Sequence, residues 1–230
     1  MARLIPILLM IIGVFVMIKI SSWQTGRTLR RRSRPLLNDQ IEALLSRLAR
    51  TAGIDKVEVR LLDMPVVNGL ATPSGEIYIT QGLFRKFQTG RISAAELASV
   101  VAHEMGHLAL GHTKRRIIDV TGAQTIHLVL GSILNRFIPI LGWIVARWVA
   151  TFVVTRLTRK DEFEADAYAT ALMVKSGLGA GPQVRMLEKL LELVPEAAMQ
   201  ETSWLASHPP VAERAEAIRH NAERWEETAH

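Results

Sequence analysis

The chain has 230 residues, a formal net charge of +6 and no cysteine, which excludes disulfides, cysteine metal ligands and a cysteine nucleophile. Its length suits one folded domain with a membrane anchor. The basic residues gather beside hydrophobic segments, and no nucleic-acid-binding motif accompanies them. We therefore expect them to face anionic lipid headgroups, and we expect no nucleic-acid partner.

The first predicted element is an apolar run at residues 4–20, near the shortest length that spans a bilayer as a helix. A cleaved signal peptide is the alternative, but no small-residue cleavage site follows the run. The nearby arginines lie mostly after it, at Arg27, Arg30, Arg31, Arg32 and Arg34. By the positive-inside rule, residues 1–34 are predicted to form a retained anchor and basic linker in a bacterial-type inner membrane, with the following domain in the cytoplasm.

Residues 35–230 are predicted to form one mostly helical α+β domain with a small antiparallel sheet. Apolar residues repeat with helical spacing from Leu37 to Leu48, and Gly53 can end that helix. Alternating and β-branched residues predict strands at 57–62 and 76–80.

The turn-rich connection between these strands contains Asn68, Gly69, Leu70 and Ala71. This segment is expected to form a sheet edge beside the catalytic centre, where an extended substrate adds as another strand. A plain hairpin loop is the alternative, and the sequence leaves both open.

The sequence His-Glu-Met-Gly-His at residues 103–107 lies in a strongly helical context that begins with a capping box at Ser93. Positions i and i+4 share one helical face, so His103 and His107 can both bind one Zn²⁺. Glu104 is rotated by about 100° from His103 and can accept a proton from a water that the metal activates. The pattern predicts zinc-assisted hydrolysis of peptide bonds, and the alternative is a chance match on an amphipathic helix. Gly111 is expected to weaken this helix without ending it.

A second apolar stretch runs over residues 125–154 and is interrupted by Arg136, Pro139 and Arg147. It separates the two histidines from the acidic segment that follows, and all ligands of one ion must lie on one side of a membrane. Two full spans need about 40 apolar residues, more than are present. We predict a helical hairpin insertion at 125–156 that breaks near Pro139 and dips into or lies on the bilayer. A buried helix pair is the alternative.

A catalytic zinc normally has three protein ligands. A histidine six residues after the second ligand would supply the third in one common pattern, but that position is Thr113, and His112 is one residue away from it. Glu162 and Asp166 share a helical face further on, so Glu162 can bind the metal while Asp166 orients a ligand histidine. Glu164 is the competing ligand, and a solvated acidic helix start is the plain alternative.

Four separated motifs occur in order and resemble the membrane-bound zinc metallopeptidases that include HtpX and the CAAX prenyl endopeptidases, in the gluzincin clan. They are Asn-Gly-Leu-Ala at 68–71, His-Glu-Met-Gly-His at 103–107, Glu-Phe-Glu-Ala-Asp at 162–166, and His-Pro-Pro at 208–210 with Arg214. The likeness covers about residues 36–220. It departs from the HtpX pattern at the N-terminus, where one predicted span stands in place of two.

The resemblance implies a gluzincin-like fold with one Zn²⁺ per chain on His103, His107 and Glu162, and Glu104 as the base. It also implies that His208 and Arg214 approach the site and contact substrate or the tetrahedral intermediate; for His208, a helix-start role beside Pro209 is the alternative. Protein or peptide substrates, above all membrane proteins in quality control, are the expected partners. The alternative is a catalytically silent, membrane-anchored binding or chaperone-like protein with structural zinc.

Overall fold

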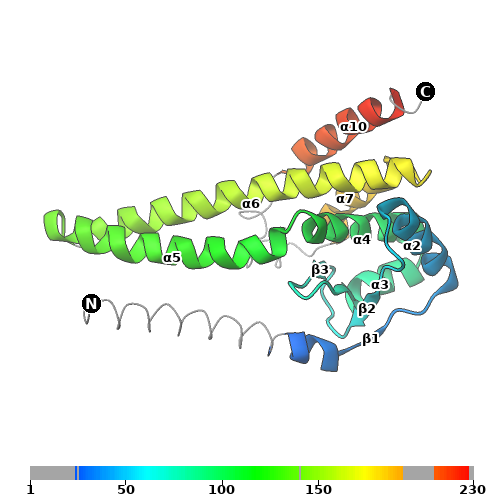
Figure 1. The fold of residues 1–230 in the computed structure, drawn as a ribbon, viewed down its shortest axis with the longest axis horizontal. Helices are drawn as coiled ribbons and strands as arrows, with labels where there is room; N and C mark the ends of the chain where they lie inside the picture. Colours follow the sequence, from blue (N-terminus) through cyan, green and yellow to red (C-terminus); the bar gives the residue numbers. More distant parts are fainter. Residues whose placement is uncertain (1–23, 25, 140, 194–209, 228–230) are drawn as a thin grey trace.

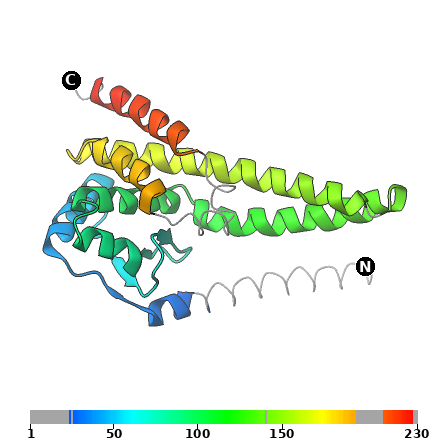
Figure 2. The ribbon, with the colours of Figure 1, turned by 180° about the vertical axis from the view of Figure 1, so that it is seen from behind.

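A computed structural model describes residues 24, 26–139, 141–193 and 210–227, so the predicted N-terminal anchor and His208 lie outside the described residues. Two long helices project from a body made of a small sheet and shorter helices (Figures 1 and 2). In chain order the elements are β1 (Ser33–Pro35), α2 (Asp39–Ala52), β2 (Val59–Leu62), β3 (Gly69–Ala71), β4 (Ile77–Thr80), α3 (Gln81–Gln88), α4 (Ala94–Ala109), α5 (His112–Phe137), α6 (Leu141–Lys175), α7 (Gly181–Leu193) and α10 (Val211–Glu227).

The sheet has the order β1-β2-β4-β3 and is mixed. β1 and β3 pair antiparallel with their neighbours, but β2 and β4 pair in parallel, so the prediction of a wholly antiparallel sheet is wrong at its centre. Parallel neighbours need a crossover connection. The chain between β2 and β4 supplies one that also carries β3, which returns as a hairpin on the far edge of β4.

The predicted first helix and both main strands are confirmed, with shorter strand bounds. The Asn38 side chain accepts a hydrogen bond from the Ile41 amide, and Gly53 ends α2 at a φ of 70°, where only glycine is unstrained. Two elements were not predicted: β1, in the basic linker, and α3, which Thr80 caps.

α4 begins with the predicted capping box, in which Ser93 and Glu96 satisfy each other's backbone amides. The helix ends at Ala109, and Gly111 has a φ of 72° between α4 and α5. The expectation that the helix continues through Gly111 is therefore wrong, because glycine takes up a left-handed conformation that ends α4 before α5 begins at His112.

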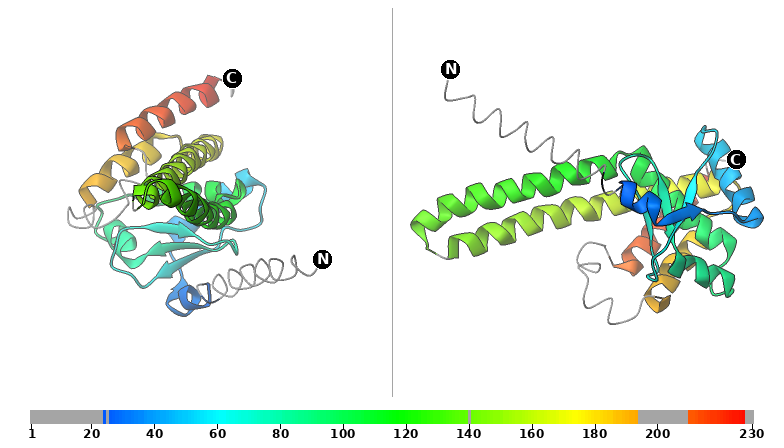
Figure 3. Two further views of the ribbon diagram at one scale, coloured as in Figure 1. Left: turned by 90° about the vertical axis from the view of Figure 1, so that its left-hand side faces the viewer. Right: turned by 90° about the horizontal axis from the view of Figure 1, so that it is seen from below.

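α5 and α6 lie side by side and run in opposite directions, with Pro139 between them (Figures 1 and 3). α6 continues unbroken for 35 residues from this pair into the body. Its buried face in the pair consists of small residues, Gly142, Ala146 and Ala150, which let the two backbones approach closely. Among the described residues, α6 is the one helix long and apolar enough to cross a membrane.

Candidate metal centre

The close crossing of α4 and α6 brings the candidate ligands together. Gly106, within the His-Glu-x-x-His sequence, faces the α6 backbone: a methyl group added there would lie 2.9 Å from the carbonyl oxygen of Ala165. Only a residue without a side chain allows this approach. As a result, the helix face that carries His103 and His107 meets the face that carries Glu162.

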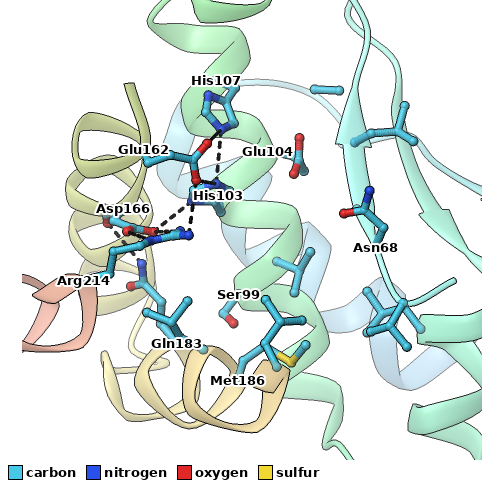
Figure 4. Close-up of a pocket in the computed structure, with 18 of the residues that line it drawn as sticks. Asn68, Ser99, His103, Glu104, His107, Glu162, Asp166, Gln183, Met186 and Arg214 are labelled. Atoms are coloured by element: carbon cyan, nitrogen blue, oxygen red, sulfur yellow. Dashed lines mark hydrogen bonds and ion pairs between the residues drawn. The ribbon is translucent and has the colours of Figure 1, made fainter. Parts of the chain in front are cut away.

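Three ligand atoms converge at the crossing (Figure 4). The Nε2 atoms of His103 and His107 are 3.1 Å apart, and the Glu162 carboxylate oxygens lie 3.5 Å and 3.4 Å from them, respectively. A tetrahedral zinc with bonds of about 2.0–2.1 Å holds its ligand atoms roughly 3.3 Å apart. The donor set therefore fits such an ion in both its chemistry and its spacing. Glu164, the competing ligand, lies instead against His112.

Asp166 and Arg214 support this group from the wall of the cavity formed by α6 and α10. The Nδ1 atom of His103 is 2.9 Å from Asp166 Oδ1, so the ring's Nε2 is directed at the candidate metal position. Arg214, from α10, donates to both oxygens of Asp166 at 2.7 Å and 2.9 Å, and its Nη1 lies 3.2 Å from Glu162. The predicted site residue Arg214 thus lines the cavity, but its guanidinium faces two carboxylates.

The electrostatics of the centre favour a cation. Burial opposes a charged His103, but hydrogen bonds with Asp166 and Glu162 outweigh it and raise the pKa of His103 to about 10. Without a metal, a proton on His103 supplies the positive charge that the two buried carboxylates attract. A divalent ion would replace that proton.

Glu104 lies on the other side of α4 from Asp166, towards β3 (Figure 4). It is 8% exposed and lines the same cavity as the three candidate ligands. A methyl group on Gly69 would lie 3.5 Å from Glu104 Oε1 and only 2.7 Å from Val100, so glycine allows β3 to pack closely on α4 at this point. The carboxylate is therefore enclosed between the candidate metal position and the strand.

The cavity has a volume of about 270 Å³ and is lined by the predicted strand segment Asn68, Gly69, Leu70 and Ala71. β3 is at the end of the sheet order, with β4 as its one partner among the described strands. The expected sheet edge is present, and the plain hairpin loop is excluded. α7 forms another wall with the apolar side chains of Met186, Leu187 and Leu190.

Sequence reasoning missed the position of His112. It set this residue aside because its spacing does not suit a metal ligand, but His112 is 1% exposed and its Nδ1 lies 3.1 Å from Nδ1 of His107. The five-residue spacing from His107, across the glycine turn, was the available signal.

Comparisons with known proteins agree with this geometry. The profile of peptidase family M48 matches residues 35–222. The chain is 28% identical over 160 residues to metalloprotease LoiP of Escherichia coli, across 66% of this chain and 58% of LoiP. It is 28% identical to mitochondrial metalloendopeptidase OMA1 of Arabidopsis thaliana, across 70% of this chain and 30% of OMA1. It is 26% identical to protease HtpX of Pseudomonas aeruginosa, across 91% of this chain and 83% of HtpX.

The alignment thus spans little more than half of LoiP and under a third of OMA1, whereas it covers most of HtpX. The family match includes every described residue of the candidate centre, and the sequence-based recognition is confirmed. The chain belongs to peptidase family M48.

Proposed function

We propose that the protein is a membrane-anchored endopeptidase with one Zn²⁺ per chain, held by His103, His107 and Glu162. The observation that carries this proposal is the convergence of two imidazole nitrogens and a buried carboxylate at 3.1–3.5 Å from one another. A site with only a structural role would normally have four protein ligands. Three ligands leave a position for water, and Glu104 lies beside it as one of three acidic groups that line the cavity.

Zinc, when bound, supplies a Lewis acid that polarises the scissile carbonyl and makes a water more acidic. Glu104 accepts a proton from the attacking water and returns it to the leaving amine. Its enclosure between α4 and β3 keeps the carboxylate oriented and limits competing solvent. Asp166 fixes the ring of His103, and Arg214 holds Asp166 and Glu162 in place. We assign Arg214 this supporting role in preference to direct contact with the intermediate, because its guanidinium already faces both carboxylates.

An extended peptide adding to the open edge of β3 would pass over the metal centre. Main-chain hydrogen bonds would then supply affinity without strong sequence preference. The wall of Met186, Leu187 and Leu190 offers an apolar subsite for one substrate side chain. Such a site suits unfolded segments of proteins, and together with the HtpX resemblance it supports a role in membrane-protein quality control.

The paired portion of α5 and α6 is the proposed contact with lipid. Its outer surface exposes many large apolar side chains, among them Leu128, Ile133, Phe137, Leu141, Ile144, Trp148 and Phe152. Burying that surface in hydrocarbon is favourable by about 25 cal/mol per Å². With the anchor predicted at residues 4–20, this pair would hold the catalytic body on the cytoplasmic face of the membrane.

The decisive experiment is proteolysis by the detergent-solubilised, full-length protein, using an unfolded membrane protein as substrate. Cleavage should require zinc, stop with a chelator and be absent in Glu104→Gln, while that variant keeps its zinc and its thermal unfolding profile. Cleavage by Glu104→Gln at the wild-type rate would contradict the assigned base. A wild-type protein that binds zinc and protects the substrate from aggregation without cutting it would favour the chaperone-like alternative.

A further inference from the structure

His112 is a buried polar residue that the mechanism above does not use. It is the first residue of α5, directly after the Gly111 turn, and it packs edge-on against His107 with ring centroids 5.2 Å apart. The two Nδ1 atoms are 3.1 Å apart, which is hydrogen-bonding distance. The Nδ1 atom of each ring is therefore engaged in a hydrogen bond with the other ring.

The opposite nitrogen of His112 faces α6. Its Nε2 is 3.0 Å from Glu164 Oε2 and 3.8 Å from Asp161 Oδ1. Basic groups hold both carboxylates: Arg115 pairs with Asp161, and Lys160 lies 3.3 Å from Glu164. Both carboxylates therefore have an oxygen directed at His112 Nε2, and the nearer one, on Glu164, lies at a distance that suits acceptance of a hydrogen bond.

The direction of each hydrogen bond follows from the proposed metal ligation. A neutral histidine that binds metal through Nε2 carries its proton on Nδ1. His107 Nδ1–H must then donate to His112 Nδ1, which leaves the His112 proton on Nε2, pointing at Glu164. The alternative tautomer of His112 would place two N–H groups against each other and leave Nε2 facing a carboxylate without a proton.

We propose that His112 is a positioning residue for the metal ligand His107, through a chain of hydrogen bonds that runs from His107 to His112 and on to Glu164. His112 orients the ring of His107 as Asp166 orients the ring of His103. The partner of His107 is a neutral imidazole, whereas the partner of His103 is a carboxylate. This inference rests on the proposed zinc function and adds a residue to the support of its centre.

A second metal site formed by His112, Asp161 and Glu164 is the competing interpretation, since their ligand atoms lie within 4.8 Å of one another. Arg115 and Lys160 argue against it, because two basic groups already neutralise the two acids.

The test is zinc affinity, measured by competition with a chromophoric chelator on the full-length protein in detergent. His112→Leu removes the acceptor for His107, and outer partners of this kind are typically worth about 10–100-fold in metal affinity. His112→Asn places an amide oxygen near the position of Nδ1 and should recover most of that loss. Equal losses in both variants, or an unchanged affinity in His112→Leu, would overturn the proposal.

A second measurement does not depend on the variants folding. Long-range ¹H–¹⁵N spectra of the zinc-loaded wild-type protein should show His112 with its proton on Nε2. A proton on Nδ1, or a second zinc per chain that His112→Leu removes, would overturn the proposal. A wild-type protein that binds no zinc overturns the proposed function as well, whereas tight wild-type binding with an unaffected His112→Leu overturns this inference alone.

Discussion

Gly106 of α4 and Ala165 of α6 are in backbone contact, and this contact sets the distance between the two histidines and Glu162. A methyl group on Gly106 would lie 2.9 Å from the Ala165 carbonyl oxygen and 3.0 Å from its Cα atom. Neither atom can rotate away, because both belong to the helix backbone.

Gly106→Ala should therefore push α6 away from α4, with a destabilisation of about 1–3 kcal/mol for overpacking and a marked loss of zinc affinity. Denaturant unfolding and chelator competition measure the two effects. Gly181→Ala is a matched control, since the nearest atom to its added methyl group is the movable end of Arg185, at 3.0 Å. Wild-type zinc affinity in Gly106→Ala would show that the crossing distance does not control the centre.

Glu162 and Glu164 are two residues apart but have different surroundings, so substitution separates their roles. Glu162→Ala should lose stoichiometric zinc, because it removes one of three donors. Glu164→Ala should keep one zinc per chain at saturation. Metal analysis of the two purified variants checks this, and the reverse result would move the ligand to Glu164.

Arg214→Met should destabilise the protein strongly, because it leaves Asp166 and Glu162 as buried, uncompensated carboxylates. Breaking a buried ion pair from one side costs about 3–5 kcal/mol. Zinc affinity should change as well, because Arg214 positions the ligand Glu162 directly and the ligand His103 through Asp166. If Arg214 instead contacted the intermediate, zinc affinity would be kept while kcat fell, and chelator competition beside steady-state kinetics distinguishes the two roles.

Stability in acid should depend on Glu96, which caps α4 and binds Lys189 of α7 at 2.9 Å. Burial opposes ionisation, but the Ser93 amide and Lys189 outweigh it and lower the pKa of Glu96 below its usual 4.5. A carboxyl group with a lowered folded-state pKa stabilises the protein above its unfolded-state pKa, and that contribution is lost as pH falls through the folded-state value.

The difference in unfolding free energy between the wild-type protein and Glu96→Gln should thus be largest above about pH 5 and shrink towards pH 3. Chelator in all samples removes any contribution from metal release. A difference that stays constant over this range would mean that the charge of Glu96 has no part in holding α7.

The absence of cysteine from the sequence allows the proposed lipid contact to be mapped directly. A dye on Val149→Cys, whose side chain is exposed in the paired portion of α6, should be quenched by spin-labelled lipids in vesicles. A dye on Asp55→Cys, at an exposed position beyond α2, should not be. Equal quenching at both positions would exclude preferential lipid contact by the helix pair.

The centre was largely predictable because its ligands follow from helical spacing. His103, His107, Glu162 and Asp166 lie where positions i and i+4 share a face, and Ser93 marks the start of the helix. These are local rules, and the structure follows them. Their roles in metal binding and catalysis remain predictions for the experiments above.

The misses concern relationships between segments. No local pattern distinguishes the parallel pairing of β2 and β4 from an antiparallel one, because the choice depends on where the connecting chain crosses. The contact between His107 and His112 depends on Gly111 adopting a φ of 72°, and spacing along a continuous helix would have turned His112 away. A glycine marks both the turn at Gly111 and the helix crossing at Gly106. Its structural role at each position depends on where the neighbouring helix lies, which a local sequence pattern does not indicate.

One unbroken helix joins the proposed lipid contact to the candidate metal centre. Trp148 and Glu162 are fourteen residues apart in α6, or about 21 Å along its axis at 1.5 Å per residue. No loop lies between them to absorb movement, so a change in tilt at one end is passed mechanically to the other. Bilayer thickness influences helix tilt, so it would then change the geometry around the ion. The rate of hydrolysis would depend on the lipid as well as on the peptide.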